Sequence, residues 1–426
     1  MNKEAISAIA IFILGFGLIS RKLEKSVVTP PMAYVAFGLL ISSSALGLIQ
    51  KVEITNETIA IIAEITLAVI LFTDASRIQL KLLRREYNLP LRLLGIGLPM
   101  TIVFGTLFAL ILFSGQLDLW SAAALATILS PTDAALGQAV VNSSRVPASV
   151  RQAINIESGL NDGICLPILL LFMSLAGGER SDSAAYWLTF TAKQIVFGTG
   201  IGLIIGYFGS KLIIKSLQYE WMTDSFEDLA VLGLSILAYT SAEVIGGNGF
   251  IASFSAGLTV GFVGTKSLLK CLHEFGEAEG QLLTLISFLL FGAVMVIPSI
   301  STASWQIWLY AIYSLIVSRI LGVAIALMGL KLQLDSILFM GWFGPRGIAS
   351  IVYGLLIIEK QSVPGSELMF TTMVVTVLIS VFAHGLTAFP GVNWYANRIS
   401  SKKSTDTCMP EMQPVSELPV RIPWRQ

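Results

Sequence analysis

Reactive and metal-binding side chains are scarce in this sequence. Its 426 residues include only two histidines and three cysteines. Cys165, Cys271 and Cys408 lie far apart without metal-ligand spacing, so neither a disulfide framework nor a zinc site is indicated. No nucleophile is paired with a base at motif spacing either. We therefore predict neither a cofactor nor an enzymatic activity.

Features of nucleotide and nucleic-acid binding are also lacking. The sequence contains no Walker A motif, which argues against coupling to ATP. The formal net charge is zero and no basic cluster is interleaved with aromatics, which argues against nucleic acid as a partner. Charged residues make up only 13% of the chain, hydrophobic residues 54%, and the mean hydropathy is +0.78. These values are typical of a polytopic membrane protein in a lipid bilayer.

Apolar stretches long enough to cross a bilayer recur along the chain. A window of about 20 residues predicts about 13 transmembrane helices in an all-α fold. They form one transmembrane domain, residues 1–390, and the polar, proline-dotted residues 391–426 are predicted to be a short disordered cytoplasmic tail. The approximate limits of the helices are 5–20, 30–49, 57–75, 89–113, 119–142, 150–176, 185–210, 228–246, 250–268, 281–298, 304–330, 335–358 and 366–390.

Positive charge is distributed unevenly over the predicted loops. With the N-terminus outside, 18 lysine and arginine residues fall on the inner side and five on the outer side. The positive-inside rule then places the C-terminus in the cytoplasm, which requires an odd number of spans. We predict a multi-pass protein of the cell membrane with this orientation.

Charged residues interrupt some of the apolar stretches. A charged side chain inside the bilayer is expensive, and its presence by default indicates an ion or proton pathway. Carboxylates outnumber cations in the fifth and sixth predicted spans, which favours Asp133 and Asp162 as the pair that exchanges ions. The residues considered for the pathway are Asp133, Glu157, Asp162, Arg319 and Arg346, whereas Glu64 and Glu243, also within or near spans, are left out of the site.

Pro131 stands in the middle of the fifth predicted span, LATILSPTDAALGQAVV. Because proline removes a backbone donor and clashes with the preceding turn, the helix should open between Ser130 and Thr132, next to Asp133. Broken helices at the bilayer midplane expose backbone carbonyls and helix ends to transported ions. A simple proline kink is the alternative, and the adjacent carboxylate favours the functional interpretation.

The sixth predicted span, RQAINIESGLNDGICLPILLLF, carries polar groups on two adjacent faces. Glu157 and Asn161 share one helical stripe, and Ser158 and Asp162 share its neighbour. The Asp162 carboxylate and the Ser158 hydroxyl are hard oxygen ligands suited to an alkali cation or a proton. Glu157 needs a partner of opposite sign, for which Arg319 is the best candidate. For this pair we favour a structural ion pair over direct transport.

A second break is predicted in the twelfth span, SILFMGWFGPRGIASIVYGLL, where Gly344 and Pro345 precede Arg346. The fifth and twelfth spans are equivalent if spans 1–6 and 8–13 are two inverted six-helix repeats joined by the seventh. Their breaks would then cross at the midplane, with Asp133 neutralising N-terminal ends of half-helices and Arg346 offsetting C-terminal ends. Alternatively, Arg346 caps an inner helix end.

Sequence motifs in the two breaks and in two other spans resemble those of a known family. SPTDAALG, ESGLNDG, the in-span Arg319 and the FGPRG break together resemble the NhaP-type sodium/proton antiporters of the monovalent cation/proton antiporter-1 family. The resemblance covers nearly the whole hydrophobic region and implies an NhaA-like antiporter fold. It also implies that Asp133 and Asp162 exchange a monovalent cation for a proton, with Asn161 supporting the site.

Further roles are implied by the same resemblance. It implies cation contacts from the Thr132 backbone carbonyl and from Ser158, and an interhelical salt bridge between Glu157 and Arg319. A third acidic ligand aligns with Asp74, which is one methylene shorter than the glutamate of relatives, so contact through a water is an alternative to direct contact. Relatives often form homodimers, and an asparagine in place of a third aspartate resembles the electroneutral subtype.

Two alternatives stay open at the level of sequence. Na+ is the favoured cation and K+ or Li+ are the alternatives, because these ions share their ligand types. A cation channel is the main rival function, although channels favour rings of identical groups and paired broken helices favour a carrier. The carrier interpretation predicts alternating access, in which spans 4–6 and 11–13 move against spans 1–3 and 8–10.

Overall fold

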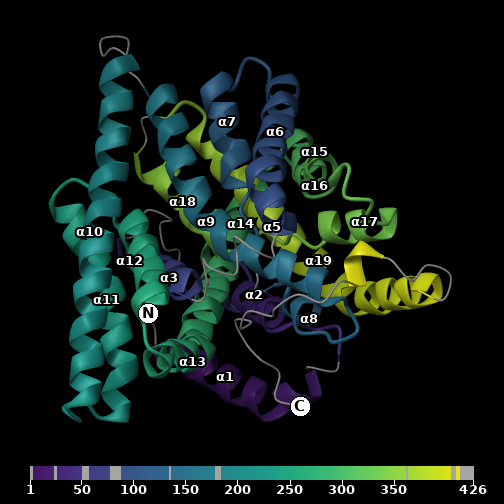
Figure 1. Ribbon diagram of the computed structural model, residues 1–426. Helices are drawn as coiled ribbons and strands as arrows, with labels where there is room; N and C mark the ends of the chain where they lie inside the picture. The colour runs from purple at the N-terminus through teal and green to yellow at the C-terminus, as the bar shows by residue number, and fades with distance from the viewer. Residues whose placement is uncertain are drawn as a thin grey trace.

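The computed structural model describes residues 3–23, 26–49, 57–76, 88–133, 136–177, 184–360, 363–403 and 409–412. Every regular element within these residues is a helix (Figure 1). The all-α architecture predicted from hydropathy is therefore confirmed.

Many of the helices are interrupted within a single predicted span. The π-helical turns η1, η2 and η3 lie in line with neighbouring α-helices and mark local shifts of helical register. The helices of the first half are α1 (Lys3–Leu23), α2 (Pro30–Ile41), α3 (Glu57–Ser76), α5 (Asn88–Arg92), η1 (Leu93–Gly97), α6 (Leu98–Leu112), α7 (Leu119–Ile128), α8 (Gln138–Val141) and α9 (Ala148–Ala176). Those of the second half are α10 (Ala184–Gln218), α11 (Asp224–Val244), α12 (Gly249–Val263), α13 (Lys266–Leu290), η2 (Phe291–Met295), α14 (Val296–Thr302), α15 (Trp305–Tyr313), η3 (Ser314–Ser318), α16 (Arg319–Leu327), α17 (Leu334–Trp342), α18 (Ile348–Lys360), α19 (Ser366–Lys403) and η4 (Pro410–Met412).

Apolar helices run through the whole described part of the chain. Seven of the described helices are long and apolar enough to cross a membrane, and five shorter apolar helices accompany them. Each predicted span overlaps at least one of the described helices. The prediction of a multi-pass membrane protein is thereby confirmed, whereas the orientation of the termini stays a prediction. The seven are Lys3–Leu23, Asn88–Leu112, Ala148–Ala176, Thr189–Gln218, Gly280–Thr302, Trp305–Leu327 and Ser366–Ser401.

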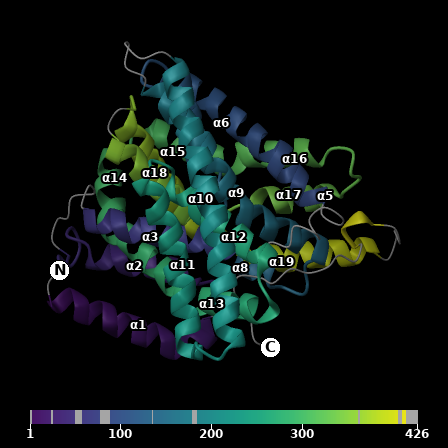
Figure 2. The ribbon, with the colours of Figure 1, turned by 60° about the vertical axis from the view of Figure 1, so that its left-hand side comes forward.

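The helices pack in two groups. In Figure 1, α10, α11 and α12 of one group lie at the left and α6, α16 and α17 of the other at the right; Figure 2 shows α10, α11 and α12 from the front. In one group, α12 packs against α3, α10 and α11, and α13 packs against α2 and α3. In the other, α6 packs against α7 and α16, and α17 and α18 pack against α19. Helix α9 joins the groups, since it contacts α7 as well as α3 and α10. The grouping resembles the two sets of spans expected to move against each other, except that α10, the seventh span, packs with α11 and α12, and α9 of the sixth span contacts both groups. The movement itself stays a prediction.

Glycines let α10 and α12 approach each other closely. Gly198, Gly202 and Gly206 recur every four residues along α10, and a Cβ on any of them would collide with backbone atoms of α12 or of its N-cap residue. Small residues at this spacing are a common means of close helix packing in membranes.

Gly202→Leu should destabilise the fold, because its side chain would collide with the Ala252 carbonyl and the Ser255 side chain. Overpacking of this kind costs about 1–3 kcal/mol. Gly200→Leu is the matched control, since nothing among the described residues lies within 4 Å of a Cβ at that position. Thermal unfolding in detergent should show a lower transition temperature for Gly202→Leu alone. Equal shifts would contradict the close contact of the two helices.

The C-terminal part of the chain differs from the predicted disordered tail. Helix α19 continues through residue 391 to Lys403. Its continuation is stabilised by Val392, Tyr395 and Ile399, which follow a helical period and are buried. Disorder is therefore the wrong prediction for the described residues of this segment, while the division of the chain into two domains stays a prediction.

Glu411 attaches the short helix η4 to the rest of the molecule. Its buried carboxylate accepts hydrogen bonds from the Gln333 N–H (2.6 Å) and the Ser336 hydroxyl (2.9 Å) at the start of α17. Its backbone carbonyl accepts a hydrogen bond from the Ser149 hydroxyl of α9 (2.5 Å). Loss of a helix cap costs about 0.5–2 kcal/mol, so Glu411→Ala should lower the thermal transition temperature. Met412→Ala on the same helix is the control, and equal transition temperatures would show that Glu411 does not stabilise α17.

Candidate functional site

The first predicted break is present. Helix α7 ends at Ile128, and the chain runs without helical structure through Pro131, Thr132 and Asp133. Thr132 and Asp133 are both buried. The opening lies where the proline was expected to produce it, so the broken fifth span is confirmed.

The second break separates α17, which ends at Trp342, from α18, which begins at Ile348. The two breaks touch each other. The Asp133 N–H donates to the Pro345 carbonyl (2.7 Å), and the Ile348 N–H donates to the Asp133 carboxylate (3.2 Å). Asp133 therefore caps the N-terminal end of α18, where negative charge is favoured.

Arg346 has the complementary role at the other helix end. Its guanidinium donates to the Ser130 and Pro131 carbonyls, which follow the C-terminal end of α7. Positive charge is favoured at such an end. Arg346 is fully buried, so its charge acts on the crossing at close range. The expected division, with Asp133 at N-terminal ends and Arg346 at C-terminal ends, corresponds to this geometry.

A hydrogen-bonded chain joins the first break to α9. The Asn161 amide donates to the Thr132 hydroxyl (2.7 Å), which lies 2.9 Å from the Ser158 hydroxyl. The other amide atom, Asn161 Oδ1, is buried and has no hydrogen-bond partner among the described residues. A buried oxygen in this state is a suitable ligand for a hard cation. Asp162, one helical turn after Ser158 and 8% exposed, adds a carboxylate to the same segment.

Glu157 and Arg319 form a buried ion pair between α9 and α16. Arg319 Nη1 and Nη2 donate to the two Glu157 carboxylate oxygens at 2.5 and 2.7 Å, and both residues are 1% exposed. This bidentate geometry is the strong form of the contact. Gly344 in the second break leaves space for Arg319, since a Cβ there would lie 2.6 Å from Arg319 Nε. The structure thus brings together the two residues that were expected to pair.

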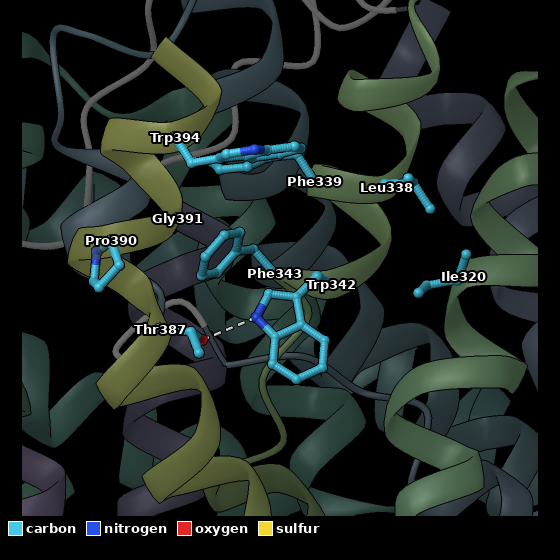
Figure 3. Close-up of a pocket in the computed structure, with 9 residues that line it drawn as sticks. All are labelled: Ile320, Leu338, Phe339, Trp342, Phe343, Thr387, Pro390, Gly391 and Trp394. Atoms are coloured by element: carbon cyan, nitrogen blue, oxygen red, sulfur yellow. Dashed lines mark hydrogen bonds between the residues drawn. The ribbon is translucent and has the colours of Figure 1, made fainter. Parts of the chain in front are cut away.

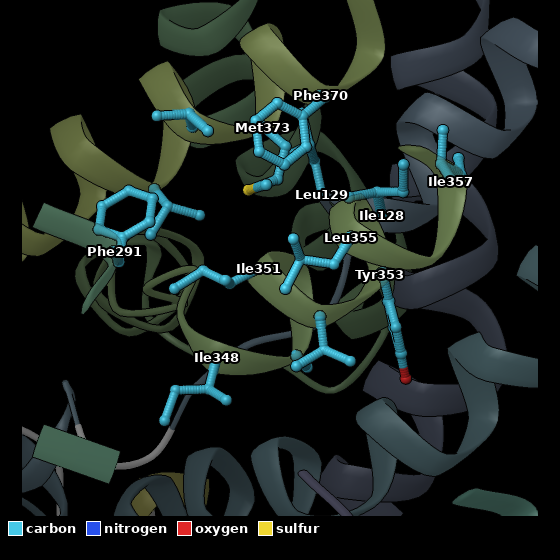
Figure 4. Packing of buried hydrophobic residues seen from close by; sticks show 14 of the residues in the cluster. Ile128, Leu129, Phe291, Ile348, Ile351, Tyr353, Leu355, Ile357, Phe370 and Met373 are labelled. Carbon is cyan, nitrogen blue, oxygen red and sulfur yellow. The ribbon is translucent and has the colours of Figure 1, made fainter. Parts of the chain in front are cut away.

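Apolar side chains enclose the crossing on the side of α18 (Figure 4). Ile128 and Leu129 from the first break, Ile348 and Ile351 from the start of α18, and Phe291 of η2 belong to one buried cluster. Dense apolar packing excludes water from this side and lowers the local dielectric. The charge-assisted contacts at the breaks are therefore stronger than they would be in water.

Comparison with known protein families shows which family this chain belongs to. The family described as "Sodium/hydrogen exchanger, transmembrane" matches residues 8–394, which is most of the chain. The chain belongs to this exchanger family. The expected resemblance to NhaP-type antiporters is thereby confirmed, and it extends over both breaks and α9.

Individual relatives of this chain differ in their named cation. It is 25% identical over 409 residues to the K(+)/H(+) antiporter NhaP of Alkalimonas amylolytica, across 92% of this chain and 66% of that protein. It is 27% identical over 373 residues to the Na(+)/H(+) antiporter of Saccharomyces cerevisiae, across 83% of this chain and 37% of that protein. The chain therefore spans less than two thirds of the length of these relatives.

A solved structure has the same fold as this chain. The sodium proton antiporter MjNhaP1 from Methanocaldococcus jannaschii superposes with a TM-score of 0.69 at 20% sequence identity. The superposition covers 90% of this chain and 99% of that one. The predicted antiporter fold is therefore confirmed.

Asp74 of α3 lies beside the segment of α9 that carries the polar groups. It is half-buried, and a Cβ built on Gly159 would lie 4.0 Å from the Asp74 Cβ. Within the described residues, no three aspartate, glutamate, histidine or cysteine side chains gather as a metal site. A monovalent cation would thus take carboxylate, hydroxyl and amide oxygens together. A contact from Asp74, direct or through water, stays a prediction.

The sequence interpretation missed two polar residues of α18 that bond to the segments at the crossing. The Ser350 hydroxyl donates to the Ile128 carbonyl at the end of α7 (2.7 Å), and the Tyr353 hydroxyl donates to the Asp162 backbone carbonyl (2.6 Å). Ser350 and Tyr353 are three residues apart and therefore share a helix face. Two polar residues on one face of an otherwise apolar span were the sequence signal that could have identified these contacts.

Proposed function

We propose that this exchanger is a secondary antiporter that moves a monovalent cation against H+ by alternating access. The proposal is carried by the crossing of the two breaks, where Asp133 and Arg346 cap opposite half-helix ends. Crossed broken helices place ion ligands at the midplane of secondary transporters. The relatives named as K(+)/H(+) and Na(+)/H(+) antiporters support the same activity.

Cation and proton compete for one site in this mechanism. Asp133 and Asp162 supply the carboxylates, and Thr132, Ser158 and Asn161 supply neutral oxygens. In a partly dehydrated cavity, a carboxylate pair that has bound a proton or a cation is favoured over the empty, charged pair. The empty site therefore does not cross the barrier. Each ion is released where the other binds, and the downhill ion drives the uphill one.

The proposal also covers the setting of the transporter. The helix group that contains α6, α7 and α16–α19 moves with α9 against the group formed by α2, α3 and α10–α13. The protein lies in the cell membrane with its N-terminus outside and its C-terminus in the cytoplasm, as the distribution of lysine and arginine favours. It forms a homodimer. Exchange is electroneutral, because Asn161 stands where a third carboxylate would add a charge.

Na+ is the proposed cation, and K+ and Li+ are the alternatives. Purified protein reconstituted into liposomes with an internal pH-sensitive dye should move protons when Na+ is added outside. Separate additions of K+ and Li+ rank the three cations in the same preparation. Clamping the membrane potential should leave the rate unchanged if exchange is electroneutral. If none of these cations caused proton movement, the proposal would be contradicted. An uncoupled cation conductance would indicate a channel instead.

A further inference from the structure

His384 of α19 is bonded to both sides of the second break. Its Nε2 lies 2.8 Å from the Trp342 carbonyl at the end of α17. Its Nδ1 lies 3.1 Å from the Ser380 hydroxyl, which accepts a hydrogen bond from the Arg346 N–H (2.6 Å). Ser380 and His384 are four residues apart on α19, so one face of this helix contacts the break at its beginning and at Arg346.

The partners of the ring determine where its proton lies. A carbonyl only accepts, so Nε2 of His384 carries the proton and donates to Trp342. Nδ1 lies 3.1 Å from the Ser380 hydroxyl and 2.9 Å from the Ser380 carbonyl, so the ring is bonded to Ser380 as well. Through Ser380, the ring links the Arg346 backbone to the end of α17. The Trp342 carbonyl also accepts the Gly344 N–H (2.8 Å), so His384 is joined to a turn of the break itself.

Trp342, the last residue of α17, makes two further contacts with α19. Its indole N–H donates to the Thr387 hydroxyl (2.9 Å, Figure 3), and its ring lies 4.9 Å from the His384 ring. Trp342 also lines an apolar cavity of about 430 Å³ between α17 and α19, to which Phe343 of the break and Trp394 of α19 contribute (Figure 3). Across this partly open contact, the hydrogen bonds to Thr387 and His384 join the end of α17 to α19.

We propose that His384 is a positioning residue of the exchange site, an inference that rests on the proposed function. His384 acts through the break and not by contact with the ion. Arg346 donates to the Ser130 carbonyl, and the Asp133 N–H is bonded to the Pro345 carbonyl in the same break. When the break relaxes, the cap on α7 and the backbone of Asp133 shift together. Cation binding then weakens because its ligands are no longer held in place.

Matched substitutions at His384 separate its two links. A glutamine amide nitrogen reaches about as far as Nε2 and keeps a donor for Trp342, whereas an asparagine amide reaches only as far as Nδ1. In proteoliposomes, His384→Ala should raise the apparent KM for Na+ about five- to tenfold, as expected for one lost buried hydrogen bond. His384→Gln should restore the KM to within about twofold of wild type, and His384→Asn should not.

A purely structural role would give a different pattern. It would lower the amount of folded protein, and with it the maximal rate, while the KM stayed that of wild type. Equal KM values for the Gln and Asn variants, or a wild-type KM in His384→Ala, would overturn the inference while wild-type exchange persists. If His384→Ala does not fold, the comparison of Gln with Asn decides alone. Absence of exchange by the wild type would instead overturn the proposed function and this inference with it.

Discussion

Asp162→Asn should abolish cation-driven proton movement in proteoliposomes. The amide keeps the shape of the carboxyl group but neither takes up a proton nor neutralises a cation. Asp162 is buried on α9, one helical turn after Ser158. The Ser158 hydroxyl is hydrogen-bonded to the Thr132 hydroxyl in the first break. With saturating Na+ inside or outside, the initial rate of dye response should therefore fall to that of protein-free liposomes.

Two comparisons show whether that loss is specific. Glu220→Gln removes an exposed carboxylate in the turn after α10 and should exchange at the wild-type rate. Asp162→Asn should also unfold near the wild-type temperature, since the amide keeps the shape of the carboxyl group and the bond from Tyr353 to the Asp162 backbone carbonyl is retained. Exchange by a folded Asp162→Asn protein at the wild-type rate would exclude Asp162 from the site.

Breaking the Glu157–Arg319 pair should have the largest effect on stability. Arg319→Met leaves the Glu157 carboxylate buried without its partner between α9 and α16. Removing one member of a buried ion pair costs about 3–5 kcal/mol, because the remaining charge is uncompensated. The transition temperature in detergent should fall strongly, or the variant should fail to yield monodisperse protein.

The double variant Glu157→Met/Arg319→Met distinguishes a pair from two independent charges. It removes both charges and fills their space with flexible apolar side chains, a change that is often close to neutral for stability. Its transition temperature should therefore lie well above that of Arg319→Met. Because the pair is assigned a structural role, the double variant should also retain exchange. A double variant as unstable as the single one would contradict the pairing.

Both breaks could be predicted because their causes are local in the sequence. Pro131 and Pro345 interrupt a helix by their own geometry, without help from distant residues. Charged residues in apolar spans likewise identify themselves, since the bilayer makes them expensive. The partner of Glu157 followed from charge alone, because Arg319 is one of the few cations within a span.

The parts that could not be predicted depend on contacts between distant segments. Glu411 reads as one more polar residue of a tail, and only the fold shows Ser336 within 2.9 Å of it. His384 belongs to no motif, and its meaning comes from the break that packs against α19. The π-helical turn η3 directly before Arg319 shifts the helical register, which a regular 3.6-residue period does not reveal.

Competition of cation and proton for one site is the central claim, and the pH dependence of cation affinity tests it most directly. The apparent KM for Na+ would be measured in proteoliposomes at a series of external pH values, with the maximal rate recorded at each. A shared site predicts that the KM rises as pH falls, approaching about tenfold per pH unit once proton binding dominates, while saturating Na+ restores the maximal rate. A KM independent of pH, with exchange still active across the series, would contradict the shared site.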